Sequence, residues 1–351
     1  MIIPNYIFNH IENVNNKNNK NNKIKSDKLY FVQENNENEL FISKKIKKIK
    51  NYNYFFNPIT NDYLLNTAKI SSEIDVIRQI NEKNKTNEKN KINIIVSRNK
   101  NPLMYPNFFS FFQNLKDNPK EFIKYILESY NYLLNSIGIL KENKICYFNI
   151  NNFSIYFNSD SNPILFDFKN SIYYEDINIK TQISNITINK ISKQLFPLEI
   201  EMLSYMNHNN SISLSKHNIE EIYENYIEKI KILLSGNIYE DEIVFHNKCI
   251  KLLLNYVNKS KDEIIVIINN EEYIKTWDNF GLSVLYIELL NDYYNSKDLL
   301  NENQSKFYNY FCKSLFLNID PNPSKRMNLE KIREHMDEIY FIDIDWIKIV
   351  S

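Results

Sequence analysis

Glycine is scarce in this sequence, which has only Gly138, Gly236 and Gly281 among its 351 residues. Loops that cradle phosphate groups need glycine where backbone amides approach the ligand closely. Because no glycine precedes Gly138, the N-terminal third of the chain lacks the residue type that such a loop requires. The composition therefore argues against mechanisms that depend on a glycine-rich phosphate loop.

Cysteine is sparse, and the sequence has neither a charge imbalance nor a long apolar run. The three cysteines, Cys146, Cys249 and Cys312, are widely separated, so neither a disulfide framework nor a zinc site is expected, and a reducing, cytoplasmic compartment fits. Lys+Arg and Asp+Glu balance at 43 each, which gives no reason to expect a nucleic-acid or membrane-surface partner. With no secretory leader pattern and no apolar run of about 18 residues, we expect a soluble protein with no membrane association.

The sequence does contain enough apolar residues for a sizeable core, at 43% hydrophobic and 14% aromatic. Two polar, low-complexity stretches at 13–22 and 81–91 are predicted to be loops. Between and around them, β-branched and aromatic residues predict strands, and one helical spacing of Ile42, Ile46 and Ile49 predicts a helix. The predicted strands are 28–33, 54–59, 70–74 and 92–96, and the predicted helix is 39–49.

From Pro119 onward the pattern becomes mostly helical. Residues 121–140 place apolar side chains along one face and predict a long amphipathic helix. The apolar stretches 145–156 and 163–168, separated by a turn at 158–162, predict two strands or a strand and a loop. Further helices are predicted at 196–206, 219–234, 242–258, 276–294, 304–316 and 328–336.

Four short segments appear in an informative order. ICYFNINNFSIY (145–156) directly follows the long helix, and ILFDFKNS (164–171) leads an apolar strand into an aspartate. FPLE (196–199) and DPNPSKR (320–326) lie on either side of TWDNFGLSVLYIELL (276–290), a strongly apolar segment that is predicted to be helical. In order, these resemble the catalytic loop, the metal-binding loop, the end of the activation segment with its arginine partner, and the buried central helix of the protein kinase superfamily. The variants are most similar to the divergent kinase-like proteins of large nucleocytoplasmic DNA viruses.

The resemblance implies an α+β, bilobal protein-kinase-like fold. It implies a small, β-rich N-lobe with one helix in residues 1–105 and a large, mostly helical C-lobe in residues 106–351. The interval from Glu199 to Thr276 is longer than in ordinary kinases and predicts an extra helical insert at about 207–275. The pattern ELFISKKIKKI is similar to the helix that follows the third strand of the small lobe, so Glu39 is expected at the helix-C glutamate position.

Most residues that would perform phosphoryl transfer are replaced. Gln33 stands where the strand lysine is expected, and Asn149 occupies the proton-acceptor position with a neutral amide that has no useful basicity. Ser154 replaces the asparagine that would ligate a second metal ion. Asp167 is retained at the metal-ligand position, but Lys169 follows it in place of glycine and brings a cation to the expected metal site.

The residues that would support the architecture are retained. The resemblance implies an ion pair between Glu199 and Arg326, and it implies that Asp278 accepts backbone hydrogen bonds from the catalytic loop. The scaffold is thus expected to be kept where the chemistry is not.

The preferred interpretation is a pseudokinase, a catalytically impaired kinase homologue that acts as a protein-binding or structural module, with a protein partner contacted through 207–275. It would reside in the host cytoplasm or the virion if the protein is viral. One alternative is an active, divergent Ser/Thr kinase that uses Asp167 with a carboxylate such as Asp160 or Asp176. The other is a virion structural protein that binds no nucleotide. ATP and Mg²⁺ are expected as cofactors only if nucleotide binding has persisted.

Overall fold

The computed structural model describes residues 2–3, 29–34, 36–64, 93–100, 102–148, 150–176, 179–188, 195–234, 242–295 and 302–341. In these residues the protein is an α+β structure in which helices predominate. The chain divides into two compact units: unit 1 comprises Met1–Tyr105 and Ile164–Lys169, and unit 2 comprises Pro106–Pro163 and Asn170–Ser351. The loops expected at 13–22 and 81–91 and the strand expected at 70–74 lie outside the described residues.

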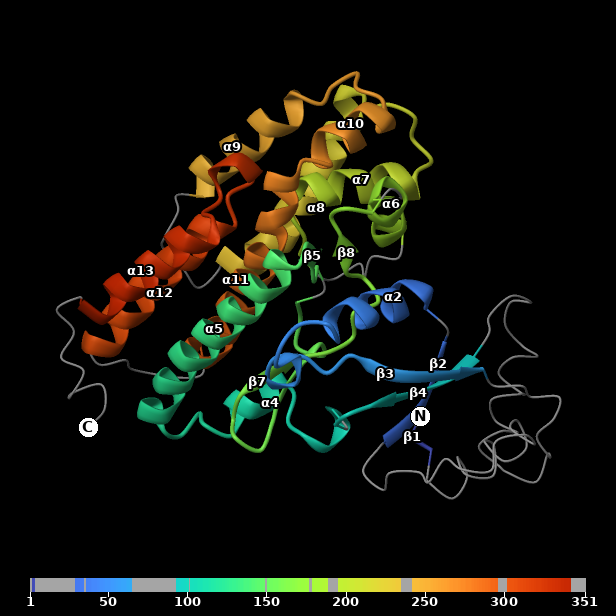
Figure 1. The fold of residues 1–351 in the computed structure, drawn as a ribbon. Coiled ribbons are helices and arrows are strands. Elements are labelled where there is room, and N and C mark those ends of the chain that lie inside the picture. The colour runs from blue at the N-terminus through green and yellow to red at the C-terminus, as the bar shows by residue number, and fades with distance from the viewer. Residues whose placement is uncertain are drawn as a thin grey trace. The chain divides into compact units, whose positions relative to one another are not determined.

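Unit 1 contains a four-stranded antiparallel sheet with the strand order β1-β2-β4-β3 (Figure 1). β2 and β4 pair over their full lengths, as expected for segments rich in β-branched and aromatic residues. The register changes at a bulge between Ile59 and Asn61, at the start of β3. The strand bounds are β1 (Ile2–Ile3), β2 (Leu29–Glu34), β3 (Ile59–Leu64) and β4 (Asn93–Arg98).

One described helix, α2 (Glu37–Ile46), accompanies this sheet. Asn36 caps its N-terminus by accepting a hydrogen bond from the Glu39 amide at 2.9 Å. The predicted face of Ile42 and Ile46 is fully buried. Ser43 Oγ accepts a hydrogen bond from the Ile59 amide at 3.1 Å, so α2 is tied to the first residue of β3.

The prediction of a strand at 54–59 is wrong. Tyr52–Tyr54 forms the 3₁₀ turn η1, and β3 begins only at Ile59, because Pro58 has no amide to donate to a ladder. The residues before that proline instead bond to the segment Ile164–Lys169: Leu165 donates to the Phe55 carbonyl at 3.0 Å, and Asn57 donates to the Leu165 carbonyl at 2.9 Å. This short segment is therefore part of unit 1 although it is distant in sequence.

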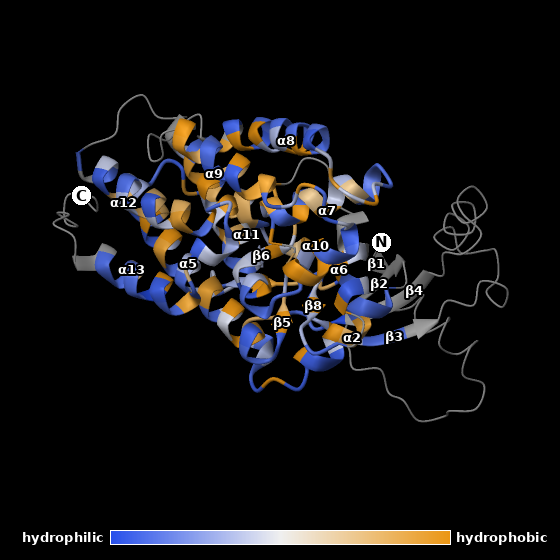
Figure 2. Ribbon diagram, turned by 90° about the horizontal axis from the view of Figure 1, so that it is seen from above, coloured by the Kyte–Doolittle hydropathy of each residue, from blue (hydrophilic) through white to orange (hydrophobic). Residues whose placement is uncertain are grey.

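Unit 2 is built around α11 (Glu271–Asn295), an apolar helix that contacts α5, α8 and α12. Figure 1 shows α5, α12 and α13 running side by side. In Figure 2, hydrophobic residues gather around α11, whereas α13 shows mainly hydrophilic residues. The other helices of unit 2 are α4 (Phe108–Gln113), α5 (Pro119–Glu142), α6 (Ile179–Ile188), α7 (Leu198–His208), α8 (Lys216–Leu234), α9 (Glu242–Leu254), α10 (Lys261–Ile268), α12 (Glu302–Asn318) and α13 (Leu329–Phe341).

The six later helices predicted from sequence, and the long helix at 121–140, are present with shifted ends. The helices α4, α6 and α10 were not predicted. In α10 a run of β-branched residues lacks a clear helical period, and the helix is instead set by a capping box between Ser260 and Glu263.

Four short strands lie between α5 and α6. β5 (Ile145–Cys146) pairs with β8 (Ile172–Tyr173), and a turn at 158–162 joins β6 (Ile155–Phe157) to β7 (Pro163–Leu165), most of which belongs to unit 1. Among the helices described, none has the length and apolar character needed to cross a membrane.

Candidate functional site

The loop that follows β5 is held by Asp278 on α11. One carboxylate oxygen of Asp278 accepts the Tyr147 amide at 2.9 Å and the other accepts the Phe148 amide at 2.7 Å. The Cys146 thiol lies 3.5 Å from the carboxylate and donates to it. Burial raises the pKa of Asp278 to about 6, and the two amides oppose that rise by stabilising the charged form. The contact that the sequence led us to expect for Asp278 is present.

Aromatic side chains fill the positions beside this anchor. Tyr147 is fully buried, and its hydroxyl donates to the Ser154 carbonyl at 3.1 Å. The Phe148 ring stacks on Phe196, with ring centroids 5.3 Å apart, and meets Trp277 edge-on at 5.6 Å. Apolar packing thus connects the loop to the residues before α7 and to α11.

Phe148 is held in a sparsely populated backbone conformation, with φ of 63°. Left-handed φ values are unusual for bulky residues and persist only where the surrounding structure enforces them. Here the hydrogen bond from the Phe148 amide to Asp278 and the stacking of its ring on Phe196 supply that constraint. The loop is therefore tightly specified.

Ser154 does not offer a free ligand oxygen within this loop. Its hydroxyl donates to the Asn151 carbonyl at 3.0 Å and accepts the Asn151 amide at 3.0 Å, closing a tight turn, and the residue is 1% exposed. The neighbouring Phe153 is 76% exposed. Asn149, the expected proton-acceptor position, lies outside the described residues.

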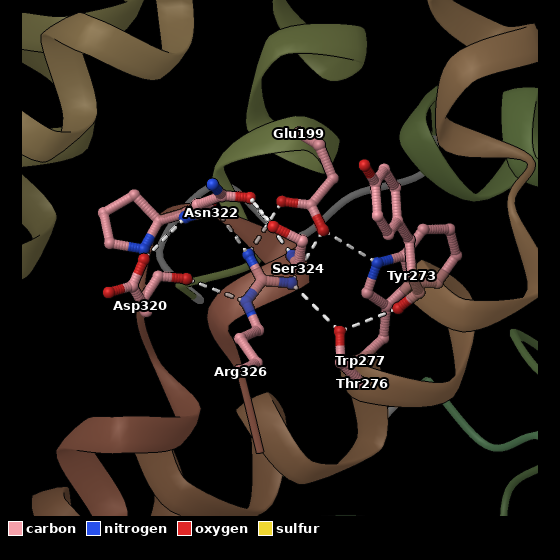
Figure 3. A network of polar contacts seen from close by, with 9 residues as sticks. Glu199, Tyr273, Thr276, Trp277, Asp320, Asn322, Ser324 and Arg326 are labelled. Atoms are coloured by element: carbon pink, nitrogen blue, oxygen red, sulfur yellow. Dashed lines mark hydrogen bonds and ion pairs between the residues drawn. The ribbon is translucent and has the colours of Figure 1, made fainter. Parts of the chain in front are cut away.

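Glu199 and Arg326 form a buried, bidentate ion pair (Figure 3). Arg326 Nη1 lies 2.7 Å from one carboxylate oxygen of Glu199 and Nη2 lies 2.8 Å from the other. Trp277 Nε1 donates to the same carboxylate at 2.9 Å. Arg326 also donates to the Thr276 hydroxyl and to the carbonyls of Asp320 and Pro321. The expected pair is present, and it joins α7, α11 and the turn before α13.

In unit 1, Asp167 lies within the returning segment Ile164–Lys169, also at a positive φ, of 64°. Lys169 Nζ lies 3.0 Å from Asp167 Oδ2. Burial raises the pKa of the Asp167 carboxyl, and the Lys169 ammonium opposes the rise. The segment is fixed by Asn38, whose side chain donates to the Lys169 carbonyl at 3.0 Å, and by Phe168, whose ring packs edge-on against Phe56.

Glu39, on the first turn of α2, is 2% exposed and is paired with Arg98. Arg98 Nη2 lies 2.6 Å from Glu39 Oε1, and Arg98 Nη1 donates to the Asn57 carbonyl at 2.8 Å. Gln33 lies in β2 opposite Ile94, and its side chain lies outside the described residues. A cation does meet Glu39, but it comes from the end of β4.

The two residues that the resemblance placed at metal-ligand positions, Asp167 and Ser154, already have other contacts. The Asp167 carboxylate is paired with the Lys169 ammonium group, which repels a divalent cation. The Ser154 hydroxyl is committed to its own turn, as described above. Among the described residues, no group of three or more His, Cys, Asp or Glu side chains could hold a metal ion.

Sequence reasoning missed Arg98. A usable signal was present: the chain has only Arg78, Arg98, Arg326 and Arg333 among its 43 basic residues. Arginine provides a planar, always-charged fork that lysine cannot replace in buried pairs. Of the described arginines, Arg98 and Arg326 are both buried and each is paired with a glutamate. In a chain this biased toward lysine, each arginine is a candidate for a buried pair with a carboxylate.

Comparison with protein-family models finds no match for this chain, and comparison with curated proteins finds none at a significant level.

Proposed function

We propose that this protein is a pseudokinase, a catalytically inactive member of the protein kinase superfamily that serves as a protein-binding or structural module. The proposal combines the motif order in the sequence with two kinds of observation, namely scaffold contacts that are complete and catalytic positions that are altered. A role in the host cytoplasm or the virion of a large DNA virus is part of the same proposal.

The scaffold contacts of unit 2 support a kinase-like architecture. Asp278 on α11 holds the Tyr147 and Phe148 amides, and Glu199 is paired with Arg326. Both interactions are buried and charged, so their geometry must be well satisfied for the fold to tolerate them. In unit 1, the helix that follows β2 carries Glu39, which is paired with the buried Arg98 at the end of β4.

The proposed loss of catalysis is inferred mainly from one observation. Lys169 is paired with Asp167, the single carboxylate kept at a metal-ligand position, at 3.0 Å. Phosphoryl transfer depends on metal ions that neutralise developing charge and on a carboxylate that positions the acceptor. A carboxylate already neutralised by lysine is a poor Mg²⁺ ligand, and the catalytic loop carries an amide at the proton-acceptor position.

The proposed partner is a protein that contacts the segment 207–275. This segment includes α9, where Ile243, Ile250 and Leu254 recur at helical spacing with exposed fractions of 68%, 37% and 50%. A double variant, Ile243→Asp with Leu254→Asp, leaves the buried face of α9 intact. It should abolish cross-linking to the partner in the cell of origin, and unchanged cross-linking would remove this segment from the proposal.

The decisive experiment for catalysis uses the purified full chain with Mg·ATP and a generic protein acceptor. We expect no phosphate transfer above background, and no rise in the thermal midpoint on adding Mg·ATP, since a ligand that binds only the native state must raise that midpoint. Asp167→Ala is the matched control for both measurements. Transfer that is present in the wild type and lost in Asp167→Ala would overturn the proposal in favour of a divergent active kinase.

A further inference from the structure

Two ion pairs in unit 1 lie on three segments that are far apart in the sequence; one pair joins two of these segments, and the other lies within the third. Glu39 comes from α2, Arg98 from the end of β4, and the Asp167–Lys169 pair from the returning segment Ile164–Lys169. The side chains of Glu39 and Arg98 are almost fully buried, at 3% and 7% exposure. Two carboxylates and two cations are thus gathered within one compact unit.

The two pairs are neighbours. Asn38, adjacent to Glu39 in α2, donates to the backbone carbonyl of Lys169 at 3.0 Å. The four charges also act on one another: Glu39 raises the pKa of Asp167 by repulsion, and Arg98 lowers it by attraction, in addition to the larger effects of burial and Lys169. The carboxylates of Glu39 and Asp167 therefore form one electrostatic site with two resident cations.

This arrangement has a physical consequence. Two carboxylates that share a partly dehydrated site repel each other and need positive charge nearby. A divalent cation is one way to supply that charge, and two basic side chains are another. Arg98 and Lys169 supply two positive charges, the same number as one Mg²⁺ ion, and both belong to the chain.

We propose that Arg98 and Lys169 are built-in counterions that substitute for a bound metal ion, so that α2 and the Asp167 segment keep their arrangement with no metal or nucleotide. This inference rests on the proposed function and deepens it. It assigns Arg98 a positioning role toward Glu39, and it explains how unit 1 retains its architecture after losing the ligands that a kinase would use.

The test removes the cations and offers a metal in their place. In Arg98→Met/Lys169→Met, the two carboxylates lose both counterions while the side-chain length is nearly conserved. We expect the thermal midpoint of this variant to fall by ~5 °C or more, because a buried carboxylate is left without its partner. Adding millimolar MgCl₂ alone, at matched ionic strength, should restore much of that loss. The wild type should not respond.

A matched control lies in unit 2, where Lys229 Nζ pairs with the buried Glu201 carboxylate at 3.0 Å. Lys229→Met also removes a cation from a carboxylate, but it leaves Glu39 and Asp167 with both of their cations, so MgCl₂ should not restore its midpoint. A double variant that stays folded by circular dichroism and shows no greater response to MgCl₂ than Lys229→Met would overturn the inference.

Two further variants keep the test decisive. If the double variant does not fold, Lys169→Met serves alone, because this exposed side chain can be removed with little structural cost, and it should show a magnesium response that the wild type lacks. Glu39→Gln added to Arg98→Met should recover stability without metal. The wild-type response to Mg·ATP tests the proposed function separately, whereas these variants are tested with Mg²⁺ and no nucleotide. One result can therefore overturn the pseudokinase proposal, and a different result can overturn the counterion role of Arg98 and Lys169.

Discussion

Replacing Arg326 with methionine leaves the Glu199 carboxylate buried with no cation. Both side chains of this pair have 0% exposure, so solvent cannot replace the lost guanidinium. Removing one partner of a buried ion pair typically costs about 3–5 kcal/mol. Arg326 also donates to the carbonyls of Asp320 and Pro321, which would lose those bonds in the variant. We therefore expect a loss in the upper part of that range.

A double-mutant cycle tests this pair further, with Arg326→Met and Glu199→Gln combined in one variant. The glutamine carries no charge, and its carbonyl oxygen can still accept the hydrogen bond from Trp277 Nε1, which lies 2.9 Å from Glu199. The double variant should therefore recover roughly 2 kcal/mol relative to Arg326→Met, because the unpaired buried charge is gone. Such a gain on adding a second substitution is the signature of a coupled pair.

Urea unfolding followed by tryptophan fluorescence measures these differences, and Trp277 lies inside the network. Lys306→Met is the control, because Lys306 and Glu302 form an exposed i,i+4 pair whose loss should cost less than about 0.5 kcal/mol. If Arg326→Met costs no more than this control, the pair does not hold α7 against the turn before α13, and the reasoning fails.

Three other changes test the loop held by Asp278. The pKa of Asp278 is about 6 in the fold against 3.8 for an ordinary aspartate, so the native state binds more protons than the unfolded chain between these values; the free energy of unfolding should fall by about 2 kcal/mol as pH rises from 4 to 6. Urea titrations should show a steeper fall in the wild type than in Asp278→Asn, and equal slopes would contradict it. Phe148→Ala removes the ring stacked on Phe196 and should cost about 3–5 kcal/mol in urea unfolding, whereas a cost below about 1 kcal/mol would mean that the aromatic cluster does not hold the loop. Gly281 lies where an added Cβ would meet Ile150 Cβ at 3.3 Å, so Gly281→Val should lower the free energy of unfolding by about 1–3 kcal/mol, and by more than Gly281→Ala does, in thermal unfolding. A Gly281→Val variant as stable as the wild type would show that Ile150 moves aside without cost.

Local sequence signals predicted several elements well. The helices α5, α8 and α12 were predicted because their apolar residues recur at helical spacing. The strands β2 and β4 were predicted from their aromatic and β-branched composition. The signals failed where a neighbour decided the outcome, as at Phe55–Asn57, whose backbone bonds to Leu165 instead of forming the predicted strand.

The candidate site shows the same division. Glu199, Arg326 and Asp278 were chosen from motifs, and their contacts are present as expected. Arg98 was missed because its partner Glu39 is 59 residues away, and nothing in either local sequence identifies the other. The resemblance placed the partner of Glu39 at Gln33, which has no charge, and the cation that does contact Glu39 could not be located from sequence.

Composition and periodicity were enough to assign the mixed α+β character, the helical second half and the lack of a glycine-rich segment in the sequence, because these depend on each residue's own chemistry and on spacing within a few turns. In unit 1, which carboxylate meets which cation depended on the tertiary structure. The sheet brings Arg98 to α2, and the returning segment brings Asp167 and Lys169 beside them. Charge neutralisation acts through space over a few ångströms, and the fold alone decides which residues lie within that range.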